Sequence, residues 1–304
     1  MKVLIAGGAG FLGYEAAKHF AKKGHKVILL DPAATQNQIL SENVEIISDS
    51  IKNIENFGNS IGKTDLIIHS AWDFTEDVKR SINENLLGTL SLAEFALSSG
   101  SRRFVFYSSS VIYGKPVSIP IAEEHPLNVE ESRAPLHALL KLYTEKLLLH
   151  YHAYKHLPLT IFRIWWSFND ERAPGKTYRE ILAKIKKGER VEVPAGAGGS
   201  IVYAPDLSLA AEKALETEEA DGKIFNAVSF FFEWSEVLRK IAERVGSRSE
   251  IVETRGEWNG PGFLEGRWQL DDSKMRRILN INVDANEREK KFIEVSLKML
   301  EKLS

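Results

Sequence analysis

The 304-residue chain predicts an α/β fold in which a Rossmann-like, doubly wound parallel sheet is followed by a smaller C-terminal region. Three features of the sequence support this prediction. Over roughly the first 165 residues, short apolar runs that suit buried strands alternate with segments of helical periodicity. A glycine-rich turn separates the first apolar run from the first helical segment, and after residue 165 loops rich in Gly and Pro become frequent. Alternating strands and helices form βαβ units, which place a parallel sheet between two layers of helices.

The individual elements follow from the same periodicities. Strands are expected at residues 3–7, 26–31, 44–48, 65–71, 103–109 and 159–164, and the clearest helices at 11–23, 82–99 and 136–155. A basic amphipathic stretch at 176–190 and the last stretch from residue 287 are expected to form surface helices. We therefore predict a Rossmann domain at 1–165 and a second region at 166–304, with some segments of the second returning to the first.

The composition excludes several classes of function. With no cysteine, the chain has no disulfide, no thiol nucleophile and no thiolate metal site. Among the 8 histidines, His152 and His156 are four residues apart but lack the glutamate of a zinc-protease motif, so no metal site is predicted. A net charge of −2 argues against a nucleic-acid partner. No apolar run reaches the roughly 18 residues of a membrane span, and no leader precedes the first strand, so a cytoplasmic protein is expected.

The glycine-rich turn has the spacing of a dinucleotide-binding loop. Gly7, Gly10 and Gly13 form a G-x-x-G-x-x-G pattern directly after the first strand and at the start of a helix. Glycine permits the tight turn and lets the backbone approach a pyrophosphate, whose negative charge the helix N-terminus favours. Asp31 ends the second strand, 18 residues after Gly13, where its carboxylate can accept hydrogen bonds from the adenosine ribose. Because this carboxylate disfavours a 2′-phosphate and no arginine follows it, the predicted cofactor is NAD rather than NADP.

Five segments carry motifs that are typical of one family. They are GGAGFLG (7–13), HSAW (69–72), NENLLGTLSLAEFA (83–96), RRFVFYSSSVIYG (102–114) and WQLDDSKMRRILNI (268–281). Together they resemble the extended short-chain dehydrogenase/reductases, which include nucleotide-sugar epimerases and dehydratases. The resemblance covers nearly the whole chain and is most specific over its first 115 residues. It implies an NAD site lined by Gly7, Gly10, Phe11, Leu12, Gly13, Asp31, Asp49, Ser50, His69, Ala71, Asn85 and Lys141.

The same resemblance implies a catalytic helix with an unusual residue. In the family, a tyrosine and a lysine four residues apart exchange the substrate proton and hold the ribose, and a serine at a strand end steadies the substrate oxygen. The segment KLYTEKLLL is similar to the one that follows the family's tyrosine, so Lys141 takes the lysine role. Ser109, four residues before the tyrosine of SSSVIYG, takes the serine role. The tyrosine position holds His137. Tyr143 is no replacement, because at about 100° per residue it lies about 160° from Lys141 around the helix.

His137 leaves three interpretations open. It could be the working acid and base, because an imidazole with a pKa near ~6.5 accepts a hydroxyl proton directly, and the neighbouring Lys141 would favour its neutral form. This predicts a limb of the pH–rate profile in the histidine range. It could instead be a structural or substrate-binding residue in a redox-silent protein that acts as an NAD-binding sensor or scaffold. In the third interpretation, Tyr107 or a water performs the proton transfer.

Other departures from the family concern the predicted substrate pocket. Trp166 stands in the position of an asparagine, Trp72 replaces the last alanine of the H-x-A-A turn, and Gly199 replaces a basic residue. These changes weaken the case for a nucleotide-sugar substrate and favour an aromatic pocket that stacks on a sugar ring or a hydrophobic alcohol. We therefore predict substrate contacts from Trp72, Ser110 and Trp166. Whichever of Trp165 and Trp166 points inward is expected to pack in the core.

The resemblance thus implies an NAD-dependent oxidoreductase or epimerase that acts by hydride transfer on a sugar or sugar-like secondary alcohol. Ser109, His137 and Lys141 would be its catalytic residues. The expected partner is a carbohydrate-like small molecule, bound mainly by the region 166–304. Homodimers through a helix pair are common in the family.

Overall fold

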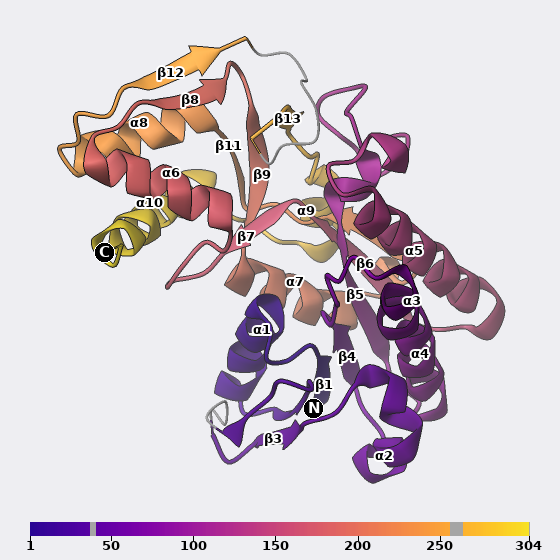
Figure 1. The fold of residues 1–304 in the computed structure, drawn as a ribbon. Coiled ribbons are helices and arrows are strands. Elements are labelled where there is room, and N and C mark those ends of the chain that lie inside the picture. Colours follow the sequence, from indigo (N-terminus) through magenta and orange to yellow (C-terminus); the bar gives the residue numbers. More distant parts are fainter. Residues whose placement is uncertain (37–40, 256–263, 304) are drawn as a thin grey trace.

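The computed structural model describes residues 1–36, 41–255 and 264–303 (Figure 1). Its larger part is a parallel sheet of seven strands in the order β10-β6-β5-β4-β1-β2-β3. From β1 the chain first adds β2 and β3 on one side and then β4, β5 and β6 on the other. The strands are β1 (Lys2–Ala6), β2 (Lys26–Leu30), β3 (Val44–Ile47), β4 (Leu66–His69), β5 (Arg103–Ser109), β6 (Leu159–Ile164) and β10 (Lys223–Asn226). This topology confirms the predicted α/β class with a Rossmann-like, doubly wound parallel sheet.

Helices cover both faces of this sheet, because side chains alternate along each strand. Along β1, Val3 and Ile5 pack in one core cluster with α1 and α7, whereas Leu4 and Ala6 pack in another with α2, α4 and α5. Figure 1 shows α1 and α7 on one side of the sheet and α4 and α5 on the other. These helices are α1 (Phe11–Lys22), α2 (Ile54–Ile61), α4 (Gly88–Ser98), α5 (Pro135–Lys155) and α7 (Ala204–Glu216). Burial on both faces explains why the strand segments are continuous apolar runs.

The smaller part of the molecule combines short strands with an aromatic core. One sheet has the order β11-β9-β13 with β7 also paired to β9, and β12 pairs with β8. Trp166, Tyr178, Trp234 and Phe292 are buried together between these strands and three helices. The elements are β7 (Trp166–Phe168), β8 (Val191–Pro194), β9 (Gly198–Tyr203), β11 (Phe230–Glu233), β12 (Ile251–Thr254), β13 (Arg267–Trp268), α6 (Lys176–Lys187), α8 (Trp234–Arg244) and α10 (Ala285–Glu301).

Segments from beyond residue 165 also lie in the larger part. Strand β10 pairs in parallel with β6 at the edge of the main sheet, with Ile224 opposite Ile161. Helix α7 packs against α1. Met275 of α9 (Ser273–Leu279) joins the core cluster that α1 and α7 form with the main sheet. The division at residue 165 remains a prediction, but the main sheet clearly uses later parts of the chain.

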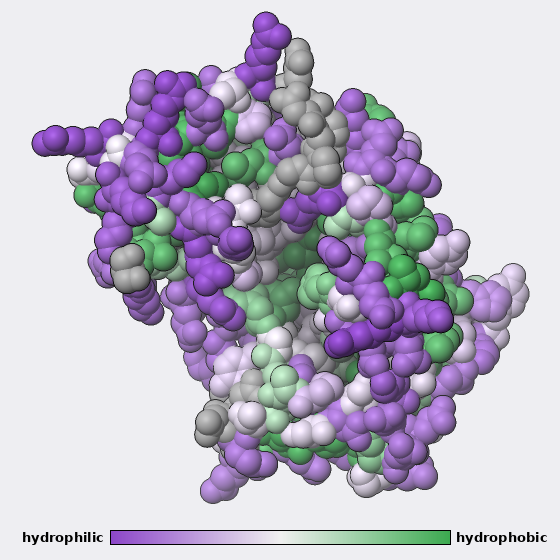
Figure 2. All heavy atoms as spheres, in the orientation of Figure 1, coloured by the Kyte–Doolittle hydropathy of each residue, from purple (hydrophilic) through white to green (hydrophobic). Residues whose placement is uncertain are grey.

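On the face of the molecule that Figure 2 shows, most residues are hydrophilic, and hydrophobic residues line a hollow between the two parts. The carboxyl ends of β1, β4 and β5, where the predicted site residues cluster in sequence, are the ends at which parallel sheets usually bind ligands. Among the described residues, no helix is both long and apolar enough to cross a membrane.

Candidate functional site

The glycine loop has the backbone that a bound pyrophosphate requires. Gly7 has a φ of 81°, and a Cβ at this position would lie 2.4 Å from the backbone nitrogen of Ala71. A Cβ at Gly13 would lie 2.1 Å from the carbonyl oxygen of Gly7. Gly10 precedes Phe11, the first residue of α1, which has neither a side-chain cap nor an acidic residue in its first turn. The first N–H groups of α1 therefore remain available for an anion.

Asp31 ties the glycine loop to the end of β2. Its Oδ2 accepts a hydrogen bond from the Ala9 N–H at 3.1 Å, and its Oδ1 accepts one from the Ala33 N–H at 2.8 Å. Each oxygen of an ionised carboxylate can accept a second hydrogen bond. The carboxylate is thus oriented by the backbone and keeps capacity for ribose hydroxyls, the role that the sequence predicts.

Asp49 and Ser50 shape the turn that follows β3. Asp49 Oδ1 accepts hydrogen bonds from the Ser50 N–H at 2.7 Å and from Asn53 Nδ2 at 2.8 Å. The Ser50 hydroxyl donates to Glu84 Oε2 at 3.2 Å, and Lys52 forms an ion pair with the same carboxylate. This network holds Asp49 and Ser50, which are both predicted to line the NAD site, against the segment that precedes α4.

His69 and Asn85 organise the loop that follows β4. His69 is buried, and its Nε2 lies 2.7 Å from the Thr89 hydroxyl. Burial, and then the charge of Lys141, lowers the pKa of His69 to about 3. The Asn85 amide binds both backbone groups of Asp73, accepting from its N–H at 2.7 Å and donating to its carbonyl at 2.8 Å. Asn85 therefore fixes the loop that carries Ala71 and Trp72, a contact that the motif alone did not reveal.

Lys141 is enclosed by backbone and aromatic groups. Only 5% of the residue is exposed, and its Nζ donates to the Tyr107 carbonyl at 2.8 Å. The same Nζ lies 3.6 Å from the ring centroid of Trp72 and 4.6 Å from that of Phe106. Burial lowers the pKa of Lys141 well below its ordinary value, and the charge of Glu145 opposes this shift.

His137 is packed between two aromatic rings beside this lysine. Its ring meets Trp72 edge-on at 5.4 Å between centroids and lies 5.2 Å from the exposed Phe74. Its Nδ1 is buried and has no hydrogen-bond partner among the described residues. Burial lowers the pKa of His137 to about 3, and Lys141 and Arg133 add to the effect. The effect of Lys141 agrees with the expectation that it favours the neutral imidazole, but burial places the pKa of His137 well below the range in which a pH–rate limb was expected.

Ser109 and its neighbours lie at the end of β5. The Ser109 hydroxyl donates to the Ile164 carbonyl and accepts from the Val111 N–H, both at 3.4 Å, which is long for hydrogen bonds. Such weak contacts leave it able to turn toward a ligand. The buried Ser110 hydroxyl has no partner among the described residues.

Tyr107 is a poor substitute for the missing tyrosine. Its side chain packs in the cluster with α1 and α7, whereas Phe106, which contacts Lys141, faces the helix layer on the other side. Because successive residues of a strand point to opposite faces, only the backbone carbonyl of Tyr107 reaches Lys141. Burial also raises the pKa of the Tyr107 hydroxyl above its ordinary value, which disfavours the phenolate.

Comparison with known proteins decides the family. The model of the NAD dependent epimerase/dehydratase family matches residues 3–227. The chain belongs to this family. The family was anticipated from the sequence motifs, and its NAD dependence agrees with the predicted cofactor.

Curated relatives match only parts of the chain. UDP-glucose 4-epimerase from Lactobacillus helveticus is 30% identical over 136 residues, which are 42% of this chain and 41% of that protein. UDP-N-acetyl-alpha-D-glucosaminuronate decarboxylase from Bacillus cytotoxicus is 28% identical over 194 residues, 60% of each chain. The matches thus span about two fifths to three fifths of these relatives' lengths.

Solved structures share the fold over nearly the whole chain. UDP-N-acetylglucosamine 4-epimerase from Methanobrevibacter ruminantium, solved with UDP-N-acetylmuramic acid, superposes with a TM-score of 0.81 at 17% identity and covers 99% of both chains. The Bordetella bronchiseptica enzyme WbmG, solved with NAD, has a TM-score of 0.80 at 22% identity and covers 99% of this chain and 94% of its own. At these identities the likeness shows the fold.

The tryptophans that depart from the family pattern lie largely in the core. Trp166 is 8% exposed, donates from Nε1 to the Pro174 carbonyl at 2.8 Å, and packs edge-on against Tyr178. Its predicted substrate contact is untested, and its ring serves the aromatic core. A Cβ at Gly199 would lie 2.2 Å from the ring of Trp165. The large ring therefore explains why no basic side chain stands at Gly199.

An ion pair that the sequence motifs did not indicate holds α5 against β6. Glu145 follows Lys141 by one turn of α5, and its carboxylate accepts two hydrogen bonds from Arg163 of β6, at 2.7 and 3.1 Å. Arg163 also donates to the Tyr113 hydroxyl at 3.0 Å. The glutamate of the KLYTEKLLL segment was visible in the sequence, but its partner Arg163 lies 18 residues later in the chain, so spacing alone did not reveal the pair. Within the described ranges, no cluster of three or more potential metal ligands occurs.

Proposed function

We propose that this protein is an NAD-dependent enzyme that oxidises a secondary alcohol of a sugar or sugar-like substrate by hydride transfer, with His137 in the position of the family's tyrosine. The observation that carries the proposal is the buried Nδ1 of His137, which has no hydrogen-bond partner among the described residues. A buried polar atom without a partner costs about 1–3 kcal/mol, so a bound molecule that supplies one is stabilised. The hydroxyl group of a bound substrate can supply this missing hydrogen bond to Nδ1 of His137.

The residues around the glycine loop fit NAD. The free N–H groups at the start of α1 would bind the pyrophosphate. Asp31 would accept hydrogen bonds from the adenosine ribose, Asp49 and Ser50 would border the adenine, and Lys141 would donate to the nicotinamide ribose. When bound, NAD supplies the acceptor for the hydride.

His137 would receive the proton of the reacting hydroxyl. A pKa of about 3 keeps its ring neutral at neutral pH, so it can accept a hydrogen bond from the substrate while Ser109 donates to the same oxygen. As the hydride leaves the carbinol carbon, the hydroxyl becomes much more acidic, and a weak base suffices. The C–H electron pair leaves with the hydride, the O–H proton goes to the imidazole, and a carbonyl forms. Return of the hydride to the opposite face gives an epimer, and release of the carbonyl gives net dehydrogenation.

The proposed substrate class is a carbohydrate. The names of the relatives refer to UDP-sugars, which supports a sugar as the reacting group. Gly199 offers no cation to a diphosphate, and Trp165 fills the adjacent space. Free sugars and sugar acids therefore belong in the test beside nucleotide sugars.

One observation favours the alternative, a redox-silent NAD-binding sensor or scaffold. The ring of Trp72 lies 3.6 Å from Lys141 Nζ, and the Tyr107 carbonyl takes a hydrogen bond from the same ammonium. A ribose hydroxyl that binds Lys141 has to displace Trp72. A protein that never moves this ring would bind the adenosine half of NAD without performing hydride transfer.

The test is to incubate the purified protein with NAD and free sugars, sugar acids, nucleotide sugars and simple secondary alcohols, following nicotinamide absorbance and sugar products. Wild type is compared with His137→Ala and with His137→Tyr, which restores the residue type of the family. We expect turnover by wild type, a loss of about 100-fold or more in kcat for His137→Ala, and retained activity for His137→Tyr. NAD binding without turnover across the panel would instead support the redox-silent protein, and equal rates for wild type and His137→Ala would remove His137 from catalysis.

A further inference from the structure

A turn from the smaller part of the molecule is fastened to the helix that follows the glycine loop. The turn comprises residues 169–172, directly after β7. Asn169 closes it, because its N–H donates to the Arg172 carbonyl at 3.0 Å and its Oδ1 accepts from the Arg172 N–H at 2.8 Å. The amide Nδ2 of the buried Asn169 donates to Glu15 Oε1 on α1 at 2.7 Å. The side chain of Asn169 therefore links the turn to the first helix.

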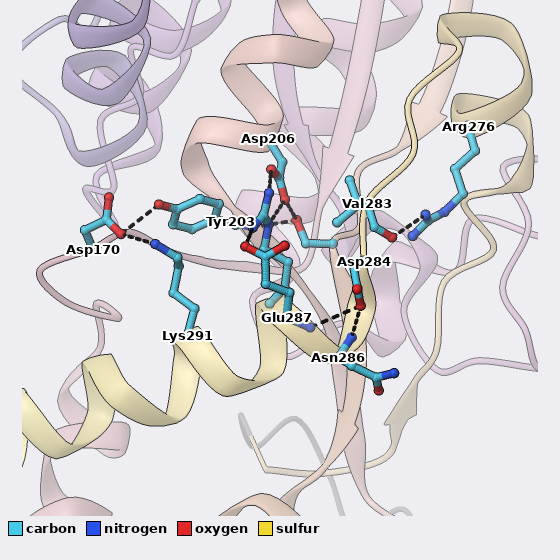
Figure 3. Close-up of polar contacts among 11 residues, drawn as sticks. Asp170, Tyr203, Asp206, Arg276, Val283, Asp284, Asn286, Glu287 and Lys291 are labelled. Atoms are coloured by element: carbon cyan, nitrogen blue, oxygen red, sulfur yellow. Dashed lines mark hydrogen bonds and ion pairs between the residues drawn. The ribbon is translucent and has the colours of Figure 1, made fainter.

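A second contact fastens the turn from the opposite direction. Asp170 Oδ1 accepts hydrogen bonds from the Tyr203 hydroxyl and from Lys291 Nζ, both at 2.7 Å. Figure 3 shows both side chains pointing at Asp170, with Lys291 coming from α10. Because the turn is held on both sides, the position of its last residue is well defined.

That last residue carries a positive charge to the start of α1. The guanidinium carbon of Arg172 lies 5.3 Å from the ring centroid of Phe11, the first residue of α1. No carboxylate of the described residues forms an ion pair with Arg172, and Glu15 already binds Lys18 and Asn169. The first turn of α1 holds no acidic side chain, and a helix N-terminus is itself positive. The exposed guanidinium of Arg172 therefore lies beside the positive end of α1.

We propose that Arg172 is a cofactor-positioning residue whose guanidinium binds the pyrophosphate of NAD together with the N–H groups of α1. Guanidinium groups bind phosphate oxygens through paired hydrogen bonds, and the cation–π contact with Phe11 limits the freedom of the Arg172 side chain. Since the turn belongs to the smaller part, this contact joins both parts of the molecule across the cofactor and slows its release. The inference rests on the NAD binding of the proposed function but not on hydride transfer or on His137.

The experiment measures NAD and ADP-ribose affinity by calorimetry, and NAD release by stopped flow, for wild type, Arg172→Ala and Arg172→Lys. Arg179→Ala, which removes an exposed arginine from α6, is the matched control. We expect Arg172→Ala to weaken both ligands about tenfold and to speed release by a similar factor. Both ligands carry the pyrophosphate, so both should weaken equally. Arg172→Lys should fall between wild type and Arg172→Ala, and Arg179→Ala should match wild type.

Each other result speaks against the proposal. Equal affinity of Arg172→Ala and wild type, or an equal loss in Arg179→Ala, would show that Arg172 makes no specific contact. These binding measurements do not depend on turnover. If the protein binds NAD but oxidises no substrate, the proposed reaction is refuted, and the binding data alone still decide whether Arg172 contacts the pyrophosphate. A wild type that binds neither ligand would refute both.

Discussion

Removing the carboxylate of Glu145 should destabilise the whole molecule. Glu145 is 1% exposed and its partner Arg163 is 3% exposed, and the pair joins α5 to β6 through two hydrogen bonds. Glu145→Ala leaves the guanidinium buried without its counter-charge, which typically costs about 3–5 kcal/mol. With an entropy of unfolding of about 0.6 kcal/mol/K for a chain of this length, the melting temperature should fall by about 5–8 °C.

Thermal unfolding followed by circular dichroism measures this effect, and two further variants test its cause. Glu216→Ala breaks an exposed ion pair with Lys213 of similar length, 2.8 Å, and should leave the melting temperature unchanged. The double variant Glu145→Leu/Arg163→Met removes both charges and should be more stable than Glu145→Ala. The explanation is refuted if the double variant is as unstable as Glu145→Ala, or if Glu145→Ala is as stable as Glu216→Ala. Either result would show that the unpaired charge of Arg163 does not cause the loss of stability.

Three further predictions concern the site. Gly13→Ala should weaken NAD binding about tenfold to a hundredfold in calorimetry, because its Cβ would lie 2.1 Å from the Gly7 carbonyl oxygen; unchanged affinity would mean that the loop adapts freely. His137 has a pKa of about 3 when folded and its ordinary 6.5 when unfolded, so its contribution to stability is complete above about pH 6.5 and is lost as the pH falls toward 3. His137→Phe should therefore reduce the pH dependence of urea unfolding by up to about 1.4 kcal/mol per pH unit in this range, and an identical slope would contradict the shifted pKa. Trp72→Ala should strengthen NAD binding by about twofold to thirtyfold, since NAD no longer displaces a cation–π contact of about 0.5–2 kcal/mol; weaker binding would show that Trp72 helps to hold NAD.

The parts of the fold that local sequence controls were predicted well. Continuous apolar runs identified the strands of the parallel sheet because both faces of that sheet are buried. The glycine spacing identified the dinucleotide loop because Gly7 needs a positive φ and Gly13 needs space for a carbonyl oxygen. Such requirements act on a residue and its near neighbours, so they leave a pattern that can be read along the chain.

The chemistry of the helix that carries His137 could be predicted only in outline. The motif located His137 and Lys141 one turn apart, but the pKa expected for the imidazole was too high. Its environment depends on Trp72 and Phe74, which lie more than sixty residues earlier in the chain. Desolvation depends on how many groups exclude water from a site, and that is a property of packing rather than of spacing.

By itself, the sequence determined the fold class and the family and predicted NAD rather than NADP, because glycine geometry, strand burial and a carboxylate at a strand end are local constraints. Only the tertiary structure decided that Trp166 packs in a core, that Trp165 excludes a side chain at Gly199, and that Trp72 covers Lys141. The contact between Arg172 and Phe11, which are 161 residues apart in sequence, likewise exists only in the folded structure. Burial and electrostatic interaction depend on distances in space, and folding sets these distances by bringing remote segments together.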